Sequence, residues 1–343
     1  MRPALKCGLL PVWRDRDTLQ IGIDPRRAIA LSGMGQAAFV IGLLDGSRER
    51  HQVIAAAADH GIPAPATERI LSLLAAGGAL DDFAISTLRE LAPALRARLA
   101  PELATTSLAH GDGDGGARAL ARRRAAVVRV EGDRRIARAT TRILSVAGVG
   151  QLHFNRPPLT AGAGPGDRGR PVSRSPGSWP KRPARQQAVR AGIAPVPPPV
   201  IPDLVVVAGR QPVERLGQLA RERVPHLAVM AGEAIGVVGP LVVPGRTACL
   251  LCLDYERADN DPAWPLILAQ LGRRSPEPPA CDAVLAAAVA AQAAAQALIA
   301  IDKNPSASAA ANGTLELVLP DWRWRRRTWQ PHPVCPCSSH SGR

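Results

Sequence analysis

Two close pairs of cysteines place the strongest restraint on how this chain can fold. Cys249 and Cys252 form a CxxC pair, and Cys335 and Cys337 form a CxC pair near the C-terminal end. Each spacing lets one turn present two thiolates, and four thiolates make the tetrahedral set that structural zinc prefers. We therefore expect one structural zinc site that ties the tail to the body. Disulfides or free thiols are the alternatives.

The ligand set has one further alternative. His332 and His340 lie close enough in sequence to the second pair for an imidazole to replace one thiolate. The chain has 6 cysteines, so Cys7 and Cys281 are left over, and we expect both to be small buried hydrophobic residues.

Composition indicates a folded protein with two domains. A chain of 343 residues is long for a single core, and its 46% of apolar residues suffices for two. The longest uncharged apolar stretch, 284–301, is interrupted by Gln292 and Gln296, and we interpret it as a buried helix with no membrane span. The first twelve residues lack the apolar length of a signal peptide. We therefore expect a cytoplasmic protein whose reduced thiols favour metal.

Charge leaves two interpretations open. The formal net charge is +14, from 43 Lys and Arg against 29 Asp and Glu, which fits an anionic partner or arginine-rich solvated faces. Tryptophan and arginine interleave from Trp322 to Trp329, as they do where bases stack. The alternative is an edge strand with Trp322 and Trp324 on one face and Arg323 and Arg325 on the other. Nucleic-acid binding is therefore one candidate function.

The first 83 residues have the pattern of a small separate module. Leu19, Ile21 and Ile23 alternate as a strand does, three short helical patterns follow, and 79–83 can return as a strand. This order predicts a winged helix, a fold that binds either nucleic acid or peptides. Residues 84–120 combine a connecting helix with a Gly/Asp segment at 111–116 that has the composition of a flexible linker.

A second domain begins near residue 121, with the pattern of a Rossmann-type phosphate loop. The strand at 127–130 leads into Gly132, Arg134 and Ala137 at the three positions of a G-x-G-x-x-G/A turn. Arg134 stands where bare backbone has to approach the phosphates, so we expect a degenerate nucleotide loop; the alternative is that Arg134 itself binds phosphate. The next strand ends in Asn155-Arg156 instead of a ribose-binding acid. Residues 157–202 are rich in Pro and Arg and predict a disordered loop.

These motifs together resemble actinobacterial ThiF-type proteins of the ubiquitin-activating-like ThiF/MoeB superfamily. The likeness rests on the module at 1–83, the degenerate loop, Gly148-Val149-Gly150, Pro225-His226-Leu227, the run 239–254, Asp261-Pro262-Ala263-Trp264-Pro265 and the run 332–337. It implies an α/β fold, in which a Rossmann-type sheet at 121–330 has helices on both faces, follows an α+β winged-helix module and precedes a zinc-binding tail at 331–343. It also implies a homodimer.

The resemblance further implies a role in the biosynthesis of azole-modified peptides. Members of this kind bind the leader of a precursor peptide and work beside a YcaO-type cyclodehydratase that uses ATP. Adenylating members need the glycine loop, a ribose-binding acid and an Asp that holds magnesium, whereas this chain has Arg134, Asn155-Arg156 and Ala208-Gly209-Arg210 at those places. We therefore expect neither ATP binding nor adenylation.

Two further expectations complete the resemblance. Cys281 stands where the enzymes keep a reactive cysteine, and without an acyl adenylate we expect it to fill the core. We expect the leader peptide to add as a strand in the region of Leu19, Ile21 and Ile23. The alternative function is an active adenylyltransferase that acts on a peptide or sulfur-carrier carboxylate.

Overall fold

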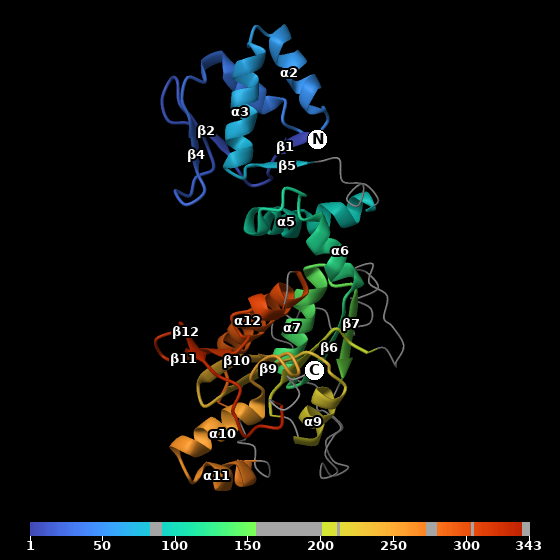
Figure 1. The fold of residues 1–343 in the computed structure, drawn as a ribbon, viewed down its shortest axis with the longest axis vertical. Helices are drawn as coiled ribbons and strands as arrows, with labels where there is room; N and C mark the ends of the chain where they lie inside the picture. Colours follow the sequence, from blue (N-terminus) through green and yellow to red (C-terminus); the bar gives the residue numbers. More distant parts are fainter. Residues whose placement is uncertain (83–90, 156–200, 211–212, 272–279, 303–304, 338–343) are drawn as a thin grey trace, which may run out of the picture. The chain divides into compact units, whose positions relative to one another are not determined.

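The chain forms two compact units, Met1–Ala121 and Arg122–Arg343 (Figure 1). The computed structural model describes all residues except 83–90, 156–200, 211–212, 272–279, 303–304 and 338–343. Most of the predicted loop at 157–202 therefore lies outside the described residues. Arg156 and His340 lie outside them as well. Each unit has a hydrophobic core of its own.

The first unit begins with short strands and helices around a small core. Its strands are β1 (Pro3–Leu5), β2 (Pro11–Trp13), β3 (Leu19–Ile21), β4 (Ile29–Leu31) and β5 (Leu80–Asp82). Its helices between β4 and β5 are η1 (Gly35–Ala38), α1 (Phe39–Gly42), α2 (Arg50–Asp59) and α3 (Ala64–Ala76). The chain starts α2 with a capping box between Glu49 and Gln52, and α3 ends at Gly77-Gly78, where Gly78 has a φ of 68°.

The strands of this unit form two separate antiparallel sheets. One has the order β2-β3-β4, and the other pairs β1 with β5. The returning strand predicted at 79–83 thus exists, but it pairs with the N-terminal strand. Among the described residues, the three-stranded sheet has two unpaired edges, β2 and β4.

The Gly/Asp segment at 111–116 is an ordered turn between α5 (Pro93–His110) and α6 (Ala117–Ala125). The carboxylate of Asp114 is buried and accepts hydrogen bonds from the backbone N–H groups of Gly116 and Arg118. The backbone N–H of Asp82 donates to the carbonyl of Gly113 over 2.7 Å. These bonds explain why a segment with the composition of a flexible linker is held in place.

A mixed sheet of seven strands forms the centre of the second unit, in the order β12-β11-β10-β9-β8-β6-β7 (Figure 1). The strands are β6 (Val127–Gly132), β7 (Gln151–Asn155), β8 (Leu204–Ala208), β9 (His226–Gly232), β10 (Ile235–Val242), β11 (Gly313–Val318) and β12 (Arg323–Thr328). Strands β7, β6, β8 and β9 run parallel, and β9 to β12 run antiparallel.

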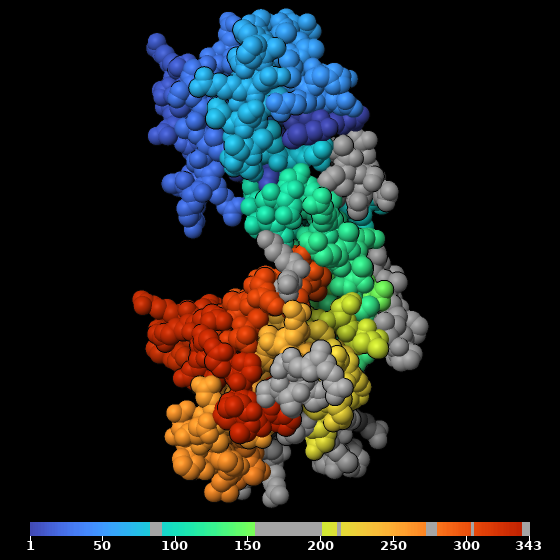
Figure 2. All heavy atoms as spheres, viewed as in Figure 1, coloured from blue at the N-terminus to red at the C-terminus, as the bar shows by residue number. Residues whose placement is uncertain are grey.

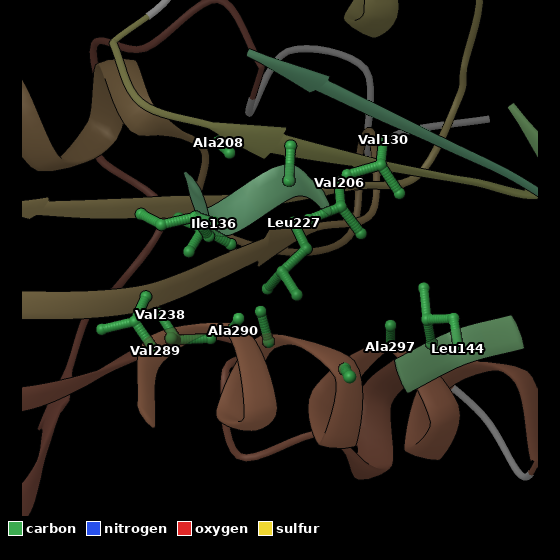
Figure 3. Close-up of a cluster of buried hydrophobic side chains, with 14 of the residues drawn as sticks. Val130, Ile136, Leu144, Val206, Ala208, Leu227, Val238, Val289, Ala290 and Ala297 are labelled. Carbon is green, nitrogen blue, oxygen red and sulfur yellow. The ribbon is translucent and has the colours of Figure 1, made fainter. Parts of the chain in front are cut away.

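Helices α7 (Arg134–Val146) and α12 (Ala283–Asp302) contribute to the main core on one side of this sheet (Figure 3). Small side chains let α12 approach the strands closely: a Cβ on Gly236 would lie 2.3 Å from Cγ2 of Val289. The other side of the sheet packs Val205 and Val207 against Leu219 of α9 (Val213–Arg221).

Among the described residues, α12 is long and apolar enough to cross a membrane by length and composition. Its buried residues lie in the core of the sheet, as the interpretation of 284–301 as a buried helix expects (Figure 3). Core packing is therefore a sufficient reason for its apolar composition.

Candidate metal centre and nucleotide turn

The four cysteines of the two pairs converge on one point. Their Sγ atoms all lie within 4.8 Å of one another. The Sγ atom of Cys249 lies 3.7 Å from that of Cys252 and 3.6 Å from that of Cys335, and the Sγ atoms of Cys252 and Cys337 lie 3.3 Å apart. A tetrahedron with zinc–sulfur bonds of about 2.3 Å has sulfur–sulfur edges of about 3.8 Å. The cluster therefore has the donor set and spacing that a bound metal ion needs.

Local structure brings the two pairs together. Cys249 is the N-cap residue of α10 (Leu250–Asn260), so Cys252 follows one turn later on the same helix. The backbone N–H of Cys335 donates to the carbonyl of His332 in a tight turn over 2.9 Å. Cys252 and Cys335 are buried with Trp329, whose indole N–H donates to Oγ1 of Thr314.

His332 lies beside the cluster without joining it. Its Nε2 atom lies 2.9 Å from Oδ2 of Asp259, and its ring stacks on Tyr255. Within the part of the chain that the structure describes, its buried Nδ1 atom has no hydrogen-bond partner. Among the described residues the group of possible ligands is thus the four cysteines, and His340 lies outside those residues.

The pKa values of the cysteines in the cluster are shifted in different directions. Burial raises the pKa of Cys249 to about 12 and also raises the pKa of Cys337. Burial opposes ionisation of Cys252 as well, but backbone hydrogen bonds of His332 and Cys249 and hydrogen bonds with neighbouring thiols lower its pKa overall. One thiolate is thus stabilised at the expense of the others, and a divalent cation would remove the penalty for ionising the remaining thiols.

The predicted nucleotide turn joins the end of β6 to the start of α7. Gly132 has a φ of 100°, which favours glycine, and the backbone N–H of Asp133 donates to the carbonyl of Ala208. Ala137 is fully buried in the core, and Arg134 is exposed on the first turn of the helix. The turn thus retains the backbone shape of a strand–turn–helix loop.

Sequence reasoning missed the role of Asp133, which is the N-cap residue of α7. Its Oδ1 atom accepts hydrogen bonds from the backbone N–H groups of Arg135 over 2.8 Å and Ile136 over 3.3 Å. These are the donors that a phosphate would use at a helix N-terminus. An Asp directly before a helix pattern is a recognisable N-cap signal, so the sequence carried this information.

The carboxylate at the end of β6, beside the turn, is already engaged. The structure places Glu131 at the end of β6, where Arg215 of α9 binds both of its oxygens at 3.0 and 2.6 Å. The same pairing raises the pKa of Arg215. Strand β8 ends in buried Ala208, followed by Gly209 and the exposed Arg210. The carboxylate of Glu131 is therefore committed to an internal ion pair.

Cys281 lies before α12 at the wall of an open pocket of about 370 Å³. Burial, followed by the nearby charge of Asp133, raises the pKa of its thiol, and Nη1 of Arg135 donates to its backbone carbonyl over 2.6 Å. A thiol with a raised pKa is a poor nucleophile at neutral pH. The pocket is lined by Ala234, Ala280, Cys281, Asp282, Leu285 and Leu319.

The residues predicted for peptide binding lie in different environments. Leu19 and Ile21 are buried in β3, which is paired on both sides by β2 and β4, whereas Ile23 is 69% exposed just beyond the strand. The free backbone of this sheet is therefore on β2 and β4. Cys7, expected to be buried, is exposed.

Comparison with known proteins finds solved structures of similar fold. No protein-family model matches this chain, and no curated protein does. Among solved structures it is similar to Escherichia coli MccB bound to AMPCPP and MccA, with a TM-score of 0.63 and 15% identity over 98% of this chain and 99% of that one. The microcin C7 biosynthetic enzyme MccB in complex with N-formylated MccA gives 0.62 and 17% over 98% and 100%.

A heterocyclase in complex with substrate and cofactor is also similar, with a TM-score of 0.62 and 16% identity over 98% of this chain and 39% of that one. This chain thus spans well under half of the heterocyclase. Identity at this level shows the fold alone: the chain has a mixed α/β, ThiF-like fold like that of MccB. This agrees with the α/β body that the resemblance implies, whereas the winged-helix module at 1–83 stays a prediction.

Proposed function

We propose that this chain binds the leader of a precursor peptide and presents it to a separate, ATP-using enzyme of the YcaO type, without activating the peptide itself. The observation that carries the proposal is the carboxylate of Asp133, which caps the helix at the degenerate nucleotide turn. The fold supports it, because the similar solved structures include MccB with the peptide MccA and a heterocyclase with its substrate.

Asp133 acts against nucleotide binding in two ways. Its Oδ1 atom already uses the N–H groups of Arg135 and Ile136, which a phosphate would otherwise receive. Its negative charge also offsets the positive end of the helix dipole. Arg134 adds a long side chain on the same turn, where bare backbone would have to meet a phosphate. Transfer of a phosphoryl or adenylyl group also needs a metal ion that stabilises the developing charge. The carboxylate of Glu131, beside the turn, is already bound by Arg215 instead.

The first unit offers an edge for the peptide, in the role of a winged-helix recognition module. Strand β4 (Ile29–Leu31) is a free edge without proline or charge, whereas the opposite edge, β2, contains Pro11, which cannot donate a backbone hydrogen bond. The C-terminal end of α3 lies against β4, since a Cβ on Gly77 would lie 2.3 Å from Cδ1 of Ile29. Leu73, one turn earlier on α3, is 46% exposed.

An extended peptide could therefore pair with β4 and place an apolar side chain on Leu73. Main-chain hydrogen bonds would supply affinity, and the contact on α3 would supply specificity. This choice moves the expected docking edge from β3 to β4, because both sides of β3 are already paired.

Peptide binding is tested with the full-length chain. Peptides of about 20 residues are selected from a display library on the immobilised protein, and the affinity of the best one is measured by calorimetry. The variant Leu73→Asp should weaken that affinity by about tenfold or more, because a charge replaces the apolar contact. Leu266→Asp, at a leucine 66% exposed on α11 (Trp264–Leu271), is the matched control and should leave it unchanged. Equal affinity in both variants would contradict this docking site.

We further propose that the four-cysteine cluster holds structural zinc. The resident metal would fix the C-terminal turn against α10, and it would have no open position for chemistry because four thiolates fill a tetrahedral shell. The spacing of the sulfur atoms supports this assignment.

An active adenylyltransferase is the second candidate, favoured by the similarity to MccB bound to AMPCPP and by two exposed arginines, Arg134 and Arg135, at the start of α7. Exchange of labelled pyrophosphate into ATP in the presence of the selected peptide distinguishes the two proposals. We expect no exchange above a protein-free blank. The double variant Asp133→Gly/Arg134→Gly, which frees the helix N-terminus, should bind ATP more tightly than the native chain does.

A further inference from the structure

Strand β12 (Arg323–Thr328) carries an arrangement that the proposed function does not use. Among the described residues it pairs with β11 alone, so it is an edge strand of the seven-stranded sheet (Figure 1). All six of its residues are exposed, and Figure 2 shows the red C-terminal part of the chain at the surface. Four of the six are arginines. An exposed edge strand presents unpaired N–H and C=O groups to other chains.

The pairing with β11 shows how the arginines divide between the two faces. Trp324 and Arg326 lie opposite Leu317 and Leu315, which belong to the core on the α12 side. The residues Arg323, Arg325 and Arg327 therefore follow the other face at every second position.

The arginines differ in what they already bind. Arg326 is held by the carbonyls of Ala309 and Ala311, and Arg325 by the carboxylate of Asp321 over 2.5 Å. Within the described part of the chain, no carboxylate pairs with the guanidinium group of Arg323 or Arg327; Asp321 binds only the backbone N–H of Arg323.

Arg327 lies over the ring of Trp329, with its guanidinium carbon 5.3 Å from the ring centroid. That contact orients the side chain and leaves its positive charge uncompensated. Arg323 and Arg327 are four residues apart on one strand face, a separation of about 13 Å. Two cations, of which Arg327 is oriented by the ring of Trp329, thus lie on one face of the edge strand.

We propose that β12 is a docking strand for an extended acidic peptide segment with carboxylates at alternate positions. The peptide backbone would pair with the free edge, and its carboxylates would meet Arg323 and Arg327. An added strand has the same two-residue period as the row of arginines, so that acidic residues four apart reach both cations. This inference is independent of the peptide site proposed on β4.

The charge of the strand argues against two other occupants. A second copy of β12 would bring rows of arginines directly opposite each other, which is destabilising. Single-stranded nucleic acid stacks its bases on open aromatic faces beside the cations, whereas the exposed Trp324 lies on the other strand face from Arg323 and Arg327, and Trp329 is buried. A peptide also uses the free main-chain groups of the edge, which a nucleotide backbone cannot match in register.

The test measures binding of a fluorescein-labelled peptide of about ten residues, with Glu and Thr alternating, to the full-length chain by anisotropy. We expect saturable binding that the double variant Arg323→Gln/Arg327→Gln weakens about tenfold. The matched control is Arg138→Gln/Arg221→Gln, which removes the same charge from exposed positions on α7 and α9 and should leave binding unchanged. Thermal melting of each variant confirms that it is folded.

Two further probes separate strand pairing from charge attraction. The same peptide with alternate backbone nitrogens methylated should bind about tenfold more weakly, because it cannot complete the ladder of hydrogen bonds. Oligothymidylate of equal charge should bind more weakly than the unmodified peptide. The proposal is overturned if both double variants lose affinity equally, if methylation has no effect, or if the oligonucleotide binds more tightly than the peptide.

Discussion

The two halves of the seven-stranded sheet differ in whether their candidate ligand sites still suit a ligand. In the parallel half, the turn after β6 keeps its backbone shape, but Asp133 caps the helix and Arg134 stands on its first turn. In the antiparallel half, four cysteines converge at the spacing a metal needs. The backbone of the turn is part of the core through Ala137, so the fold retains it whether or not a ligand binds. The cysteines pack in a small cluster with Trp329, and the convergence of four sulfur atoms there also suits a metal ion.

Loss of the metal should have the largest effect. The variant Cys252→Ser removes a ligand at the start of α10, and we expect loss of bound zinc and a fall in the free energy of unfolding on the order of 3 kcal/mol or more. Metal content and thermal melting measure both. Cys7→Ser, at an exposed cysteine in the other unit, is the control and should change neither. Unchanged stability in a zinc-free Cys252→Ser protein would refute the structural role.

A glycine in the parallel half tests whether the backbone there is retained for packing. A Cβ on Gly150 would lie 1.8 Å from the carbonyl oxygen of Arg124, so Gly150→Ala should reduce the free energy of unfolding by about 1–3 kcal/mol. Gly232→Ala is the matched control, because no atom lies within 4 Å of the added Cβ. Urea denaturation of both variants measures the difference. Similar losses at the two positions would show that close packing at Gly150 is unimportant.

The cap at Asp133 should have a smaller effect. Asp133→Ala leaves the N–H groups of Arg135 and Ile136 without their acceptor and should cost about 1 kcal/mol of stability. Asp133→Asn keeps an acceptor oxygen and should cost less. If urea denaturation finds the two variants equally stable, the carboxylate does not cap the helix in solution.

Acid should weaken the second unit through His226. Burial lowers the pKa of this imidazole below its ordinary value of 6.5. The unfolded chain therefore binds the proton more readily, so the stability that His226 contributes is present above pH 6.5 and is lost as the pH falls below it. Urea denaturation at pH 7.5 and pH 5 should show this slope, and His226→Asn should flatten it. If His226→Asn loses as much stability between pH 7.5 and pH 5 as the native chain does, the acid sensitivity arises from other groups.

The sequence predicted the parts that depend on local pattern or strong ligand chemistry. The cysteine pairs, the strand–turn–helix at β6 and α7, and the buried helix α12 were all recognisable from spacing and periodicity. The zinc itself and the leader-peptide role remain predictions.

The rest depends on long-range contacts that a local pattern cannot specify. The pairing of β5 with β1 joins segments nearly 80 residues apart, and burial of Asp114 turns a flexible-looking segment into an ordered turn. The ion pair of Glu131 with Arg215 likewise joins distant segments. Asp133 is different, because an Asp directly before a helical pattern is a local signal for a helix cap.

Calorimetric titration of the full-length native chain with ATP and magnesium tests the central claim most directly. The account predicts no saturable heat at millimolar nucleotide, since Asp133 and Arg134 occupy the turn that the phosphates require. A saturable one-site isotherm, abolished by crowding the turn with a larger side chain at Gly132, would show that the parallel half still holds a nucleotide and would contradict the account.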